Sequence, residues 1–253
     1  MSIQTIFRAA ILALISVQLG FSQGQVQDGP ALDFVGTSTN GFNFALTLGW
    51  SFEVHAPVKV DALGFFDHFE SDEDGLGFDH LVRLWTDQSE DGQIDPVLLA
   101  STTITNSSTP VSTMADNGRW LFNPISPIVL GPGRYVIGAD DPACSSGCDR
   151  YRMVVNEFTI PEISFGEARS TSAYGPPLSD QPNLNGGYFG PNFAATPILL
   201  GDVNGDGAVD LLDVNPFVTT IGDDVYIIEA DMNLDGIVDL LDVALFIDAL
   251  TGT

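Results

Sequence analysis

The chain has 253 residues, of which 44% are hydrophobic and 17 are Phe, so it can bury the core of one medium domain and one small domain. Its 34 Asp and Glu residues against 8 Lys and Arg give a formal net charge of −26. This charge argues against nucleic acids and anionic membrane surfaces as partners, because both repel a strongly acidic protein.

Residues 1–22 have the pattern of a secretory signal peptide. Arg8 precedes an apolar run from Ala9 to Leu19, and the small-residue pattern Gly20-Phe21-Ser22 follows. The run is too short to cross a bilayer as a helix, so a retained membrane anchor is the lesser alternative. Cleavage leaves 7 basic residues minus 34 acids, or −27. We expect a secreted protein, extracellular or at the cell surface, with no membrane insertion after cleavage.

Residues 23–198 are predicted to form a mainly β domain, an antiparallel β-sandwich of jelly-roll-like type. Apolar residues alternate with polar ones from Phe42 to Val54, which is typical of a half-buried strand, and Gly49 predicts a bulge or bend within it. Gly, Pro, Asn and Asp turns separate further short strands, as in a sandwich. These strands are expected at 58–66, 80–86, 97–104, 119–122, 133–138, 151–158 and 187–193.

A loop from Asp67 to Gly75 contains five acids and lies close in sequence to His80. Carboxylate oxygens are the ligands that calcium prefers. The loop therefore supplies a candidate third metal site, for which the alternative is a solvated acidic loop. The candidate ligands are Asp67, Asp72, Asp74 and Asp79.

The only two cysteines, Cys144 and Cys148, lie in one short loop. In a chain exported to an oxidising compartment, a local disulfide between them is the expected state. Two thiols alone would make an incomplete zinc site, so we give the metal alternative little weight.

Four large aromatic residues suggest a carbohydrate-binding role, because aromatic faces stack on sugar rings. These residues are Trp50, Trp85, Trp120 and Tyr188. The alternative is that they belong to the core, since large aromatics at strand positions are usually buried.

No motif predicts catalysis. The three histidines, His55, His68 and His80, form neither a metalloprotease motif nor a nucleophile elbow. A carboxylate pair could hydrolyse glycosides, and three glutamates are available for it, but acids are too abundant here for any pair to be informative. These glutamates are Glu157, Glu162 and Glu167. We expect a protein that is not an enzyme, with glycoside hydrolysis as the alternative.

Six segments of the β region resemble a domain that recurs in exported bacterial proteins, often ones with C-terminal sorting tails. The segments are Ala62-Leu-Gly-Phe-Phe-Asp, Asp74-Gly-Leu-Gly, His80-Leu-Val-Arg-Leu-Trp, Leu98-Leu-Ala-Ser, Gly133-Arg-Tyr-Val-Ile-Gly-Ala and Tyr188-Phe-Gly-Pro-Asn-Phe. The resemblance supports export and implies no particular activity.

The C-terminal segment, residues 199–253, contains an internal repeat with a period of 29. Between residues 202–221 and 231–250, eleven of twenty pairs are identical. Six of these pairs fall at positions 1, 3, 5, 6, 9 and 12 of twelve-residue loops at 202–213 and 231–242. Calcium binds six to eight oxygens, and a short loop wraps the ion when alternate residues point inward and glycine at position 6 allows a sharp turn.

The two loops therefore predict two calcium sites. Position 7 would contribute a backbone carbonyl, which needs no particular side chain, and position 9 would reach the ion through water. The predicted ligands are Asp202, Asn204, Asp206, Ala208, Asp210 and Asp213 in the first loop, and Asp231, Asn233, Asp235, Ile237, Asp239 and Asp242 in the second.

Each loop is expected to lead into an amphipathic helix, because apolar residues recur at steps of three and four. These residues are Leu211, Val214, Phe217, Val218 and Ile221 in the first repeat, and Leu240, Val243, Phe246, Ile247 and Leu250 in the second. Gly222 and Gly252 are expected to cap the helix ends, and Pro216 suits the first turn. Twelve acids and no Lys or Arg between 201 and 253 predict a segment that folds on binding calcium.

Two loop-plus-helix motifs without a preceding helix, with Asp instead of Glu at position 12, resemble a type I dockerin, an EF-hand-like module. This resemblance implies docking onto a partner, a cohesin in cellulosome systems. The sequence departs from that family at positions 10 and 11, where Leu211-Leu212 and Leu240-Leu241 replace the usual Ser-Thr pair, and it lacks the usual basic residues. We therefore expect a cohesin-like or other extracellular scaffold protein as partner.

These features predict a secreted, non-catalytic protein that uses a calcium-dependent, dockerin-like module for extracellular assembly or surface attachment of a β-sandwich binding domain. The alternative is a carbohydrate-binding accessory protein, or a glycosidase-like enzyme, in polysaccharide breakdown.

Overall fold

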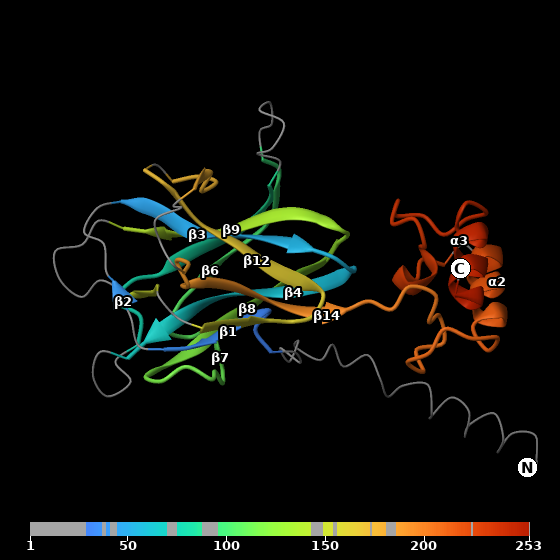
Figure 1. Cartoon of the computed structure of the whole chain (residues 1–253), viewed down its shortest axis with the longest axis horizontal. Coiled ribbons are helices and arrows are strands. Elements are labelled where there is room, and N and C mark those ends of the chain that lie inside the picture. The colour runs from blue at the N-terminus through green and yellow to red at the C-terminus, as the bar shows by residue number, and fades with distance from the viewer. Residues whose placement is uncertain are drawn as a thin grey trace, which may run out of the picture.

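The structure is a computed structural model that describes residues 29–36, 39–40, 45–69, 75–87, 96–142, 149–153, 156–172, 174–180, 186–223 and 225–252. The predicted signal peptide and the two cysteines, Cys144 and Cys148, lie outside the described residues. In the described part, antiparallel strands dominate up to Pro197 and both α-helices follow Val214 (Figure 1). The prediction of a mainly β protein is thus confirmed.

Most strands belong to two antiparallel sheets. The larger sheet has the order β13-β12-β3-β9-β5-β6, and the smaller has the order β14-β4-β8-β7. The larger contains β3 (Leu46–Val54), β5 (His80–Thr86), β6 (Leu98–Ile104), β9 (Gly133–Asp141), β12 (Ile163–Thr171) and β13 (Ser179–Asp180). The smaller contains β4 (Val58–His68), β7 (Thr109–Val111), β8 (Gly118–Leu130) and β14 (Pro191–Pro197).

Two short pairs of strands complete the β region. In the first pair, β1 (Leu32–Val35) runs antiparallel to β11 (Asn156–Thr159). In the second pair, β2 (Thr39–Asn40) runs antiparallel to β10 (Tyr151–Arg152). Both pairs join segments that are more than a hundred residues apart in sequence. They therefore bring the start of the β region into contact with residues 151–159.

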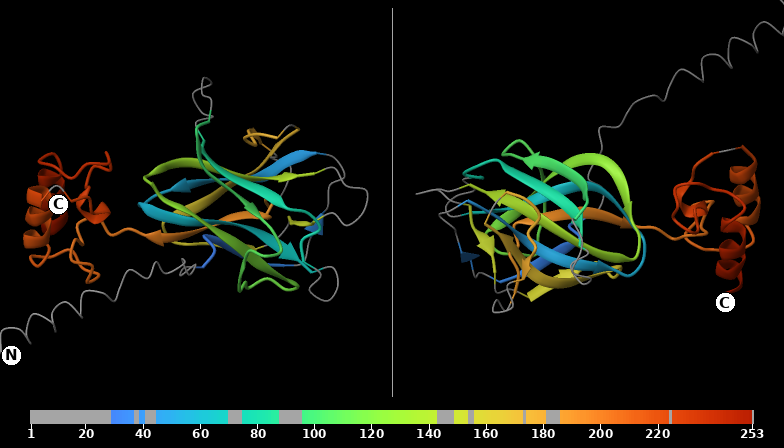
Figure 2. Two further views of the ribbon diagram at one scale, coloured as in Figure 1. Left: turned by 180° about the vertical axis from the view of Figure 1, so that it is seen from behind. Right: turned by 90° about the horizontal axis from the view of Figure 1, so that it is seen from above.

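The two larger sheets face each other across an aromatic core. Trp50 and Phe52 on β3 stack on Phe193 of β14, with ring centroids 6.0 and 4.8 Å apart. The indole Nε1 of Trp50 also donates a hydrogen bond of 2.8 Å to the carbonyl of Pro191. Seen from behind and from above, the strands form two layers (Figure 2). Aromatic side chains at alternate strand positions therefore hold the layers together.

Three predictions about strands need correction. Gly49 is not at a bulge: it pairs in register with Gly138 and Arg169, and the register shift lies on β12 between Phe165 and Ala168. The segment 151–158 forms two short strands in different pairs, not one strand. The strand predicted at 187–193 begins later, at Pro191.

The C-terminal segment contains α2 (Val214–Asp223), a 3-10 helix η1 (Ile228–Ala230) and α3 (Asp242–Thr251). Both predicted helices are present. Gly252 caps α3 in the left-handed region, at φ 67°, as predicted, whereas Gly222 lies inside α2 and does not cap it. In all three views, α2 and α3 lie on the side of this segment that faces away from the strands (Figures 1 and 2).

The change from strands to helices is abrupt. The N–H of Ile198 still donates to Pro57 in the β region, at 2.9 Å. The N–H of Gly201 donates to Glu229 in the helical segment, at 2.7 Å. Hydrogen bonding thus changes from the β region to the helical segment within three residues, between Ile198 and Gly201.

Candidate metal centre

The two predicted loops, 202–213 and 231–242, have the same internal hydrogen bonds. In each, the carboxylate at position 1 accepts the N–H groups of positions 5 and 6, and the carboxylate at position 12 accepts those of positions 3 and 9. The side chains at positions 3, 5 and 9 each accept the N–H two residues further on. All these distances lie between 2.7 and 3.1 Å.

The backbone of the loops also repeats. Position 6 is in the left-handed region in both, with φ 89° at Gly207 and 88° at Gly236, so the sharp turn predicted for glycine is present. Position 4 is left-handed as well, with φ 74° at Gly205 and 57° at Leu234. A leucine is strained in this region of backbone conformation. The second loop nevertheless keeps the backbone conformation of the first.

The four carboxylates at positions 1 and 12 are buried, although the other acids of the loops are largely exposed. These four are Asp202, Asp213, Asp231 and Asp242. No basic side chain of residues 201–253 can balance their charge, because that segment contains no Lys or Arg. Buried ionised carboxylates need a counter-charge. The arrangement therefore favours a divalent cation in each loop.

The donor set fits calcium, which binds oxygen ligands only. Within the described ranges, no group of three His, Cys, Asp or Glu side chains is arranged to hold a metal ion. The loop carboxylates accept N–H groups of their own loops instead. An ionised carboxylate has about four acceptor sites, and two N–H bonds leave two of them for an ion. Two of the six predicted ligands of each loop are an asparagine oxygen and a backbone carbonyl, which are not carboxylates. The loop geometry therefore carries the candidate site.

A small apolar core joins the two repeats. The rings of Phe217 on α2 and Phe246 on α3 stack with centroids 4.0 Å apart and planes 5° from parallel. Both phenylalanines occupy the same position of the repeat, 29 residues apart, so equivalent side chains of the two repeats meet in this core. Ala230 of η1 completes the fully buried part of this core. A core this small supplies little stability of its own.

An apolar groove of about 330 Å³ lies between α2 and α3. The corresponding residues of the two helices line it: Val214 and Val243, Phe217 and Phe246, Val218 and Ile247, and Ile221 and Leu250, together with Leu240. The leucines at positions 10 and 11, of which Leu240 lines the groove, are among the most exposed apolar residues of the described chain. Leu211, Leu212, Leu240 and Leu241 are 81, 65, 77 and 66% exposed. Exposed apolar surface of this kind is a candidate contact site for another molecule.

The structure places the remaining candidate residues apart from these loops. Asp67 is buried and pairs with Arg119 at 3.0 Å, Asp79 is exposed, and Asp72 and Asp74 lie outside the described residues. The third metal site therefore stays a prediction. The hypothesis of a sugar-stacking platform is wrong, because all four of its residues are buried: Trp50, Trp85, Trp120 and Tyr188. Of the three glutamates considered for glycoside hydrolysis, Glu167 lines a polar hollow on the six-stranded sheet.

One residue at the candidate site has no counterpart in the repeat. The hydroxyl of Tyr226 donates to Asp231, the first residue of the second loop, at 3.1 Å. Burial, followed by this hydrogen bond and the nearby acids, raises the pKa of Tyr226 to about 12. The corresponding residue of the first repeat is Pro197, so the internal alignment gives no signal for this contact.

Comparison of the chain with models of protein families, with curated proteins and with solved structures found no match in any of the three. No α-helix in the described ranges has the length and apolar character needed to cross a bilayer. The functional interpretation therefore depends on the residues of the chain itself.

Proposed function

We propose that this chain is an exported, non-catalytic protein with two parts, in which a dockerin-like segment folded around two calcium ions attaches an antiparallel β-sandwich to an extracellular protein. The observation that carries the proposal is the pair of matching loops, each with buried carboxylates at positions 1 and 12. Chance similarity of two acidic loops would not produce the same hydrogen bonds and the same left-handed positions twice.

In each loop, the side chains at positions 1, 3, 5 and 12 and the carbonyl at position 7 would hold the ion, with position 9 acting through water. Calcium neutralises the buried carboxylates and so lets α2 and α3 close on the stacked phenylalanines Phe217 and Phe246. Asn204 and Asn233 reduce the number of charged ligands in each loop, which lowers the mutual repulsion of the remaining carboxylates.

The groove between α2 and α3, with its neighbouring leucines, is the proposed docking surface. Its lining is apolar, and residues 201–253 contain twelve acids and no basic residue. Two calcium ions leave eight of these negative charges unbalanced. The partner therefore presents an apolar surface bordered by Lys and Arg, because such a border matches the negative charge of this segment. A second copy of this chain would carry the same negative charge and be repelled, so the proposed occupant is a scaffold protein.

Calcium binding is tested by titration calorimetry of the secreted chain from which calcium has been removed. We expect two ions per chain, and one ion for Asp213→Ala or Asp242→Ala, which each remove the buried ligand at position 12 of one loop. Asp248→Ala is the matched control, because Asp248 is exposed on α3 and outside both loops. No ion uptake by the unmodified chain would refute the calcium site, and equal uptake by all variants would refute the assigned ligands.

Docking is tested with the full chain as bait in the extracellular fraction of its source, in calcium and in chelator. A partner identified by mass spectrometry must then bind the purified chain directly. We expect binding in calcium that is lost in chelator and weakened by Leu211→Ser with Leu240→Ser. Leu199→Ser is the control, since Leu199 is exposed but lies outside the groove. Binding that survives both chelator and the double variant would contradict the proposed surface.

A further inference from the structure

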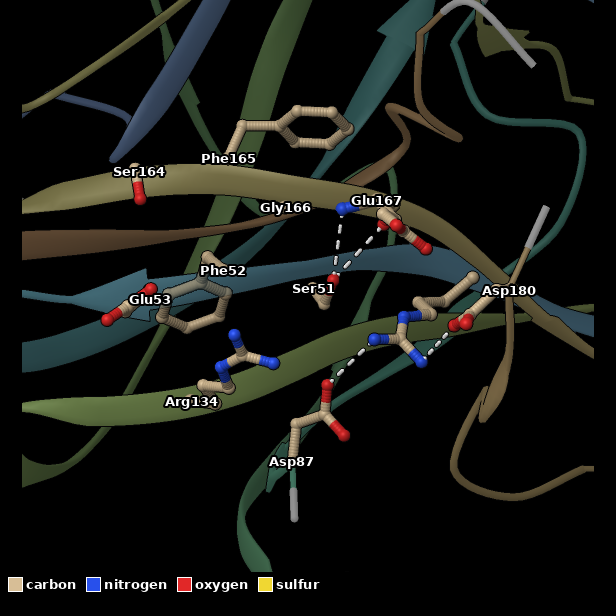
Figure 3. A pocket seen from close by; sticks show the side chains of 11 residues that line it. Ser51, Phe52, Glu53, Asp87, Arg134, Ser164, Phe165, Gly166, Glu167 and Asp180 are labelled. Atoms are coloured by element: carbon tan, nitrogen blue, oxygen red, sulfur yellow. Dashed lines mark hydrogen bonds and ion pairs between the residues drawn. The ribbon is translucent and has the colours of Figure 1, made fainter. Parts of the chain in front are cut away.

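The outer face of the six-stranded sheet contains a polar hollow of about 380 Å³ (Figure 3). Successive side chains of a strand point to opposite faces. On β3, Trp50 and Phe52 belong to the core, so Ser51 and Glu53 point away from it. Arg134 of β9 lies directly opposite Glu53 and shares this outer face. The hollow is thus separate from the metal loops, and it meets the aromatic core only at Phe52 and Phe165 of its lining.

A bulge in β12 forms one wall of the hollow. The register of β12 against β3 shifts between Phe165 and Ala168, which leaves Gly166 and Glu167 unpaired. The hydroxyl of Ser51 accepts the N–H of Glu167 at 3.0 Å and so holds the bulge against β3. A Cβ at Gly166 would lie 2.6 Å from Ser51 Oγ, so any larger residue would close this space. The hollow is therefore built into the sheet and is not a gap between loops.

A buried arginine lies at the base of the hollow. The side chain of Arg169 on β12 is 8% exposed, and its Nη2 donates to Asp87 at 3.0 Å while Nη1 bonds to Asp180. Its Nε is buried and has no hydrogen-bond partner in the described protein. A buried donor without a partner is unfavourable. Arg134 of β9 and the two partners of Arg169, Asp87 and Asp180, also line the hollow and are labelled in Figure 3.

The charges that line the hollow decide what it can bind. Two arginines stand against four carboxylates, so the net charge is −2 and an anionic ligand is disfavoured. The four carboxylates are Glu53, Asp87, Glu167 and Asp180. A cation would compete with Arg169, which already forms ion pairs with two of these acids. A neutral ligand that offers several donors and acceptors can bond to arginines and carboxylates at once.

From these observations we propose that the hollow binds a neutral saccharide unit. Neighbouring hydroxyl groups both donate and accept, so one sugar face can bond to Arg134, Arg169 and Glu53 together. The volume is within the range of pockets that hold small molecules, about 300 to 1,000 Å³. The largely polar lining argues against a lipid or another apolar ligand. This proposal does not depend on the calcium loops.

The test uses the full chain, in calcium and in chelator, on a printed array of neutral and uronic-acid oligosaccharides. The best neutral oligosaccharide is then titrated by calorimetry. We expect binding of neutral oligosaccharides in both buffers, weakened at least about tenfold by Arg134→Ala or Glu53→Gln, because each loses a charged hydrogen bond. Lys59→Ala is the matched control, since Lys59 is a basic residue of β4 in the opposite sheet.

Tryptophan fluorescence during urea unfolding checks that the variants fold, because all three Trp residues lie in the β region. Arg134 and Glu53 are exposed, so their variants should unfold like the unmodified chain. The proposal is overturned if no neutral oligosaccharide binds, if only acidic ones bind, or if Arg134→Ala and Glu53→Gln bind as well as Lys59→Ala. Loss of saccharide binding in chelator alone would also overturn it, because the hollow contains no residue of the metal loops.

Discussion

Some polar side chains are buried in this molecule at a cost in free energy, and Asp141 is one of them. Asp141 at the end of β9 is buried, and its Oδ2 has no hydrogen-bond partner in the described part of the chain. Nearby, His80 contacts Asp149 at 2.9 Å. Burial raises the pKa of Asp141 from 3.8 to about 7; His80 partly opposes this shift and Asp149 adds to it. The carboxyl therefore keeps its proton in the folded chain at pH values where the unfolded chain loses it.

This predicts an unusual pH dependence. Between pH 4 and pH 7, unfolding releases the proton of Asp141, so the contribution of this residue to stability falls as the pH rises and is lowest above pH 7. Asp141→Asn removes this dependence. The loss of unfolding free energy from pH 5 to pH 8 should shrink by on the order of 2 kcal/mol in the variant. Urea unfolding followed by tryptophan fluorescence measures it, and equal pH dependence in both proteins would contradict the prediction.

At the scale of elements, close backbone contact between strands matters as much as the aromatic core. Gly49 on β3 faces Gly138 on β9, and a Cβ at Gly49 would lie 1.8 Å from the carbonyl oxygen of Ile137. No side-chain movement can relieve a clash with backbone. The glycine at this position is thus required by the close approach of two central strands.

Gly49→Ala should therefore lower the unfolding free energy of the β region by about 3 kcal/mol or more, because β3 and β9 must move apart. Gly175→Ala is the control, since a Cβ there has open space within 4 Å and should change stability by less than about 0.5 kcal/mol. Urea unfolding by tryptophan fluorescence distinguishes the two variants. A Gly49→Ala protein as stable as the control would show that the strands separate at little cost.

Alternation of apolar and polar residues predicted the strands that contribute to the aromatic core, and it failed where other forces act. In β12, the bulge at Gly166 breaks the alternation, and Arg169 is buried only because Asp87 and Asp180 neutralise it. β1 was missed because it is short and pairs with β11, far away in sequence.

The candidate sites differ in the same way. The two loops could be proposed as metal sites from the sequence because their candidate ligands lie within twelve residues and recur at a fixed period. The hollow proposed for saccharide binding could not be found in this way, because it combines residues of β3, β9, β12 and β13 that come together only after folding. The alignment of the repeats likewise gave no sign of Tyr226.

On the scale of the whole molecule, the two parts depend on different sources of stability. The β region has an extensive aromatic core, whereas the helical segment has three fully buried apolar residues, Phe217, Ala230 and Phe246. We therefore propose that the second part relies on calcium and that the first does not.

We expect chelator to remove most of the helical circular dichroism at 222 nm while the tryptophan-detected unfolding midpoint of the full chain stays unchanged. The physical reason is that the acids of residues 201–253 repel one another without the ions, and all Trp residues lie in the β region. Readding calcium should restore the helical signal, whereas readding magnesium at the same concentration should restore less of it. Helical signal that persists in chelator, or a midpoint that falls with it, would contradict this division.

The four exposed leucines at positions 10 and 11 also affect the tendency of the chain to associate with itself. They are Leu211, Leu212, Leu240 and Leu241. Exposed apolar side chains of this kind favour self-association. The formal charge of −26 opposes it through electrostatic repulsion between copies. Added salt screens the repulsion between charges that are more than about 10 Å apart at 0.1 M. The negative charge of the chain thus keeps copies apart and leaves the exposed leucines available to a partner. This effect weakens as the salt concentration rises.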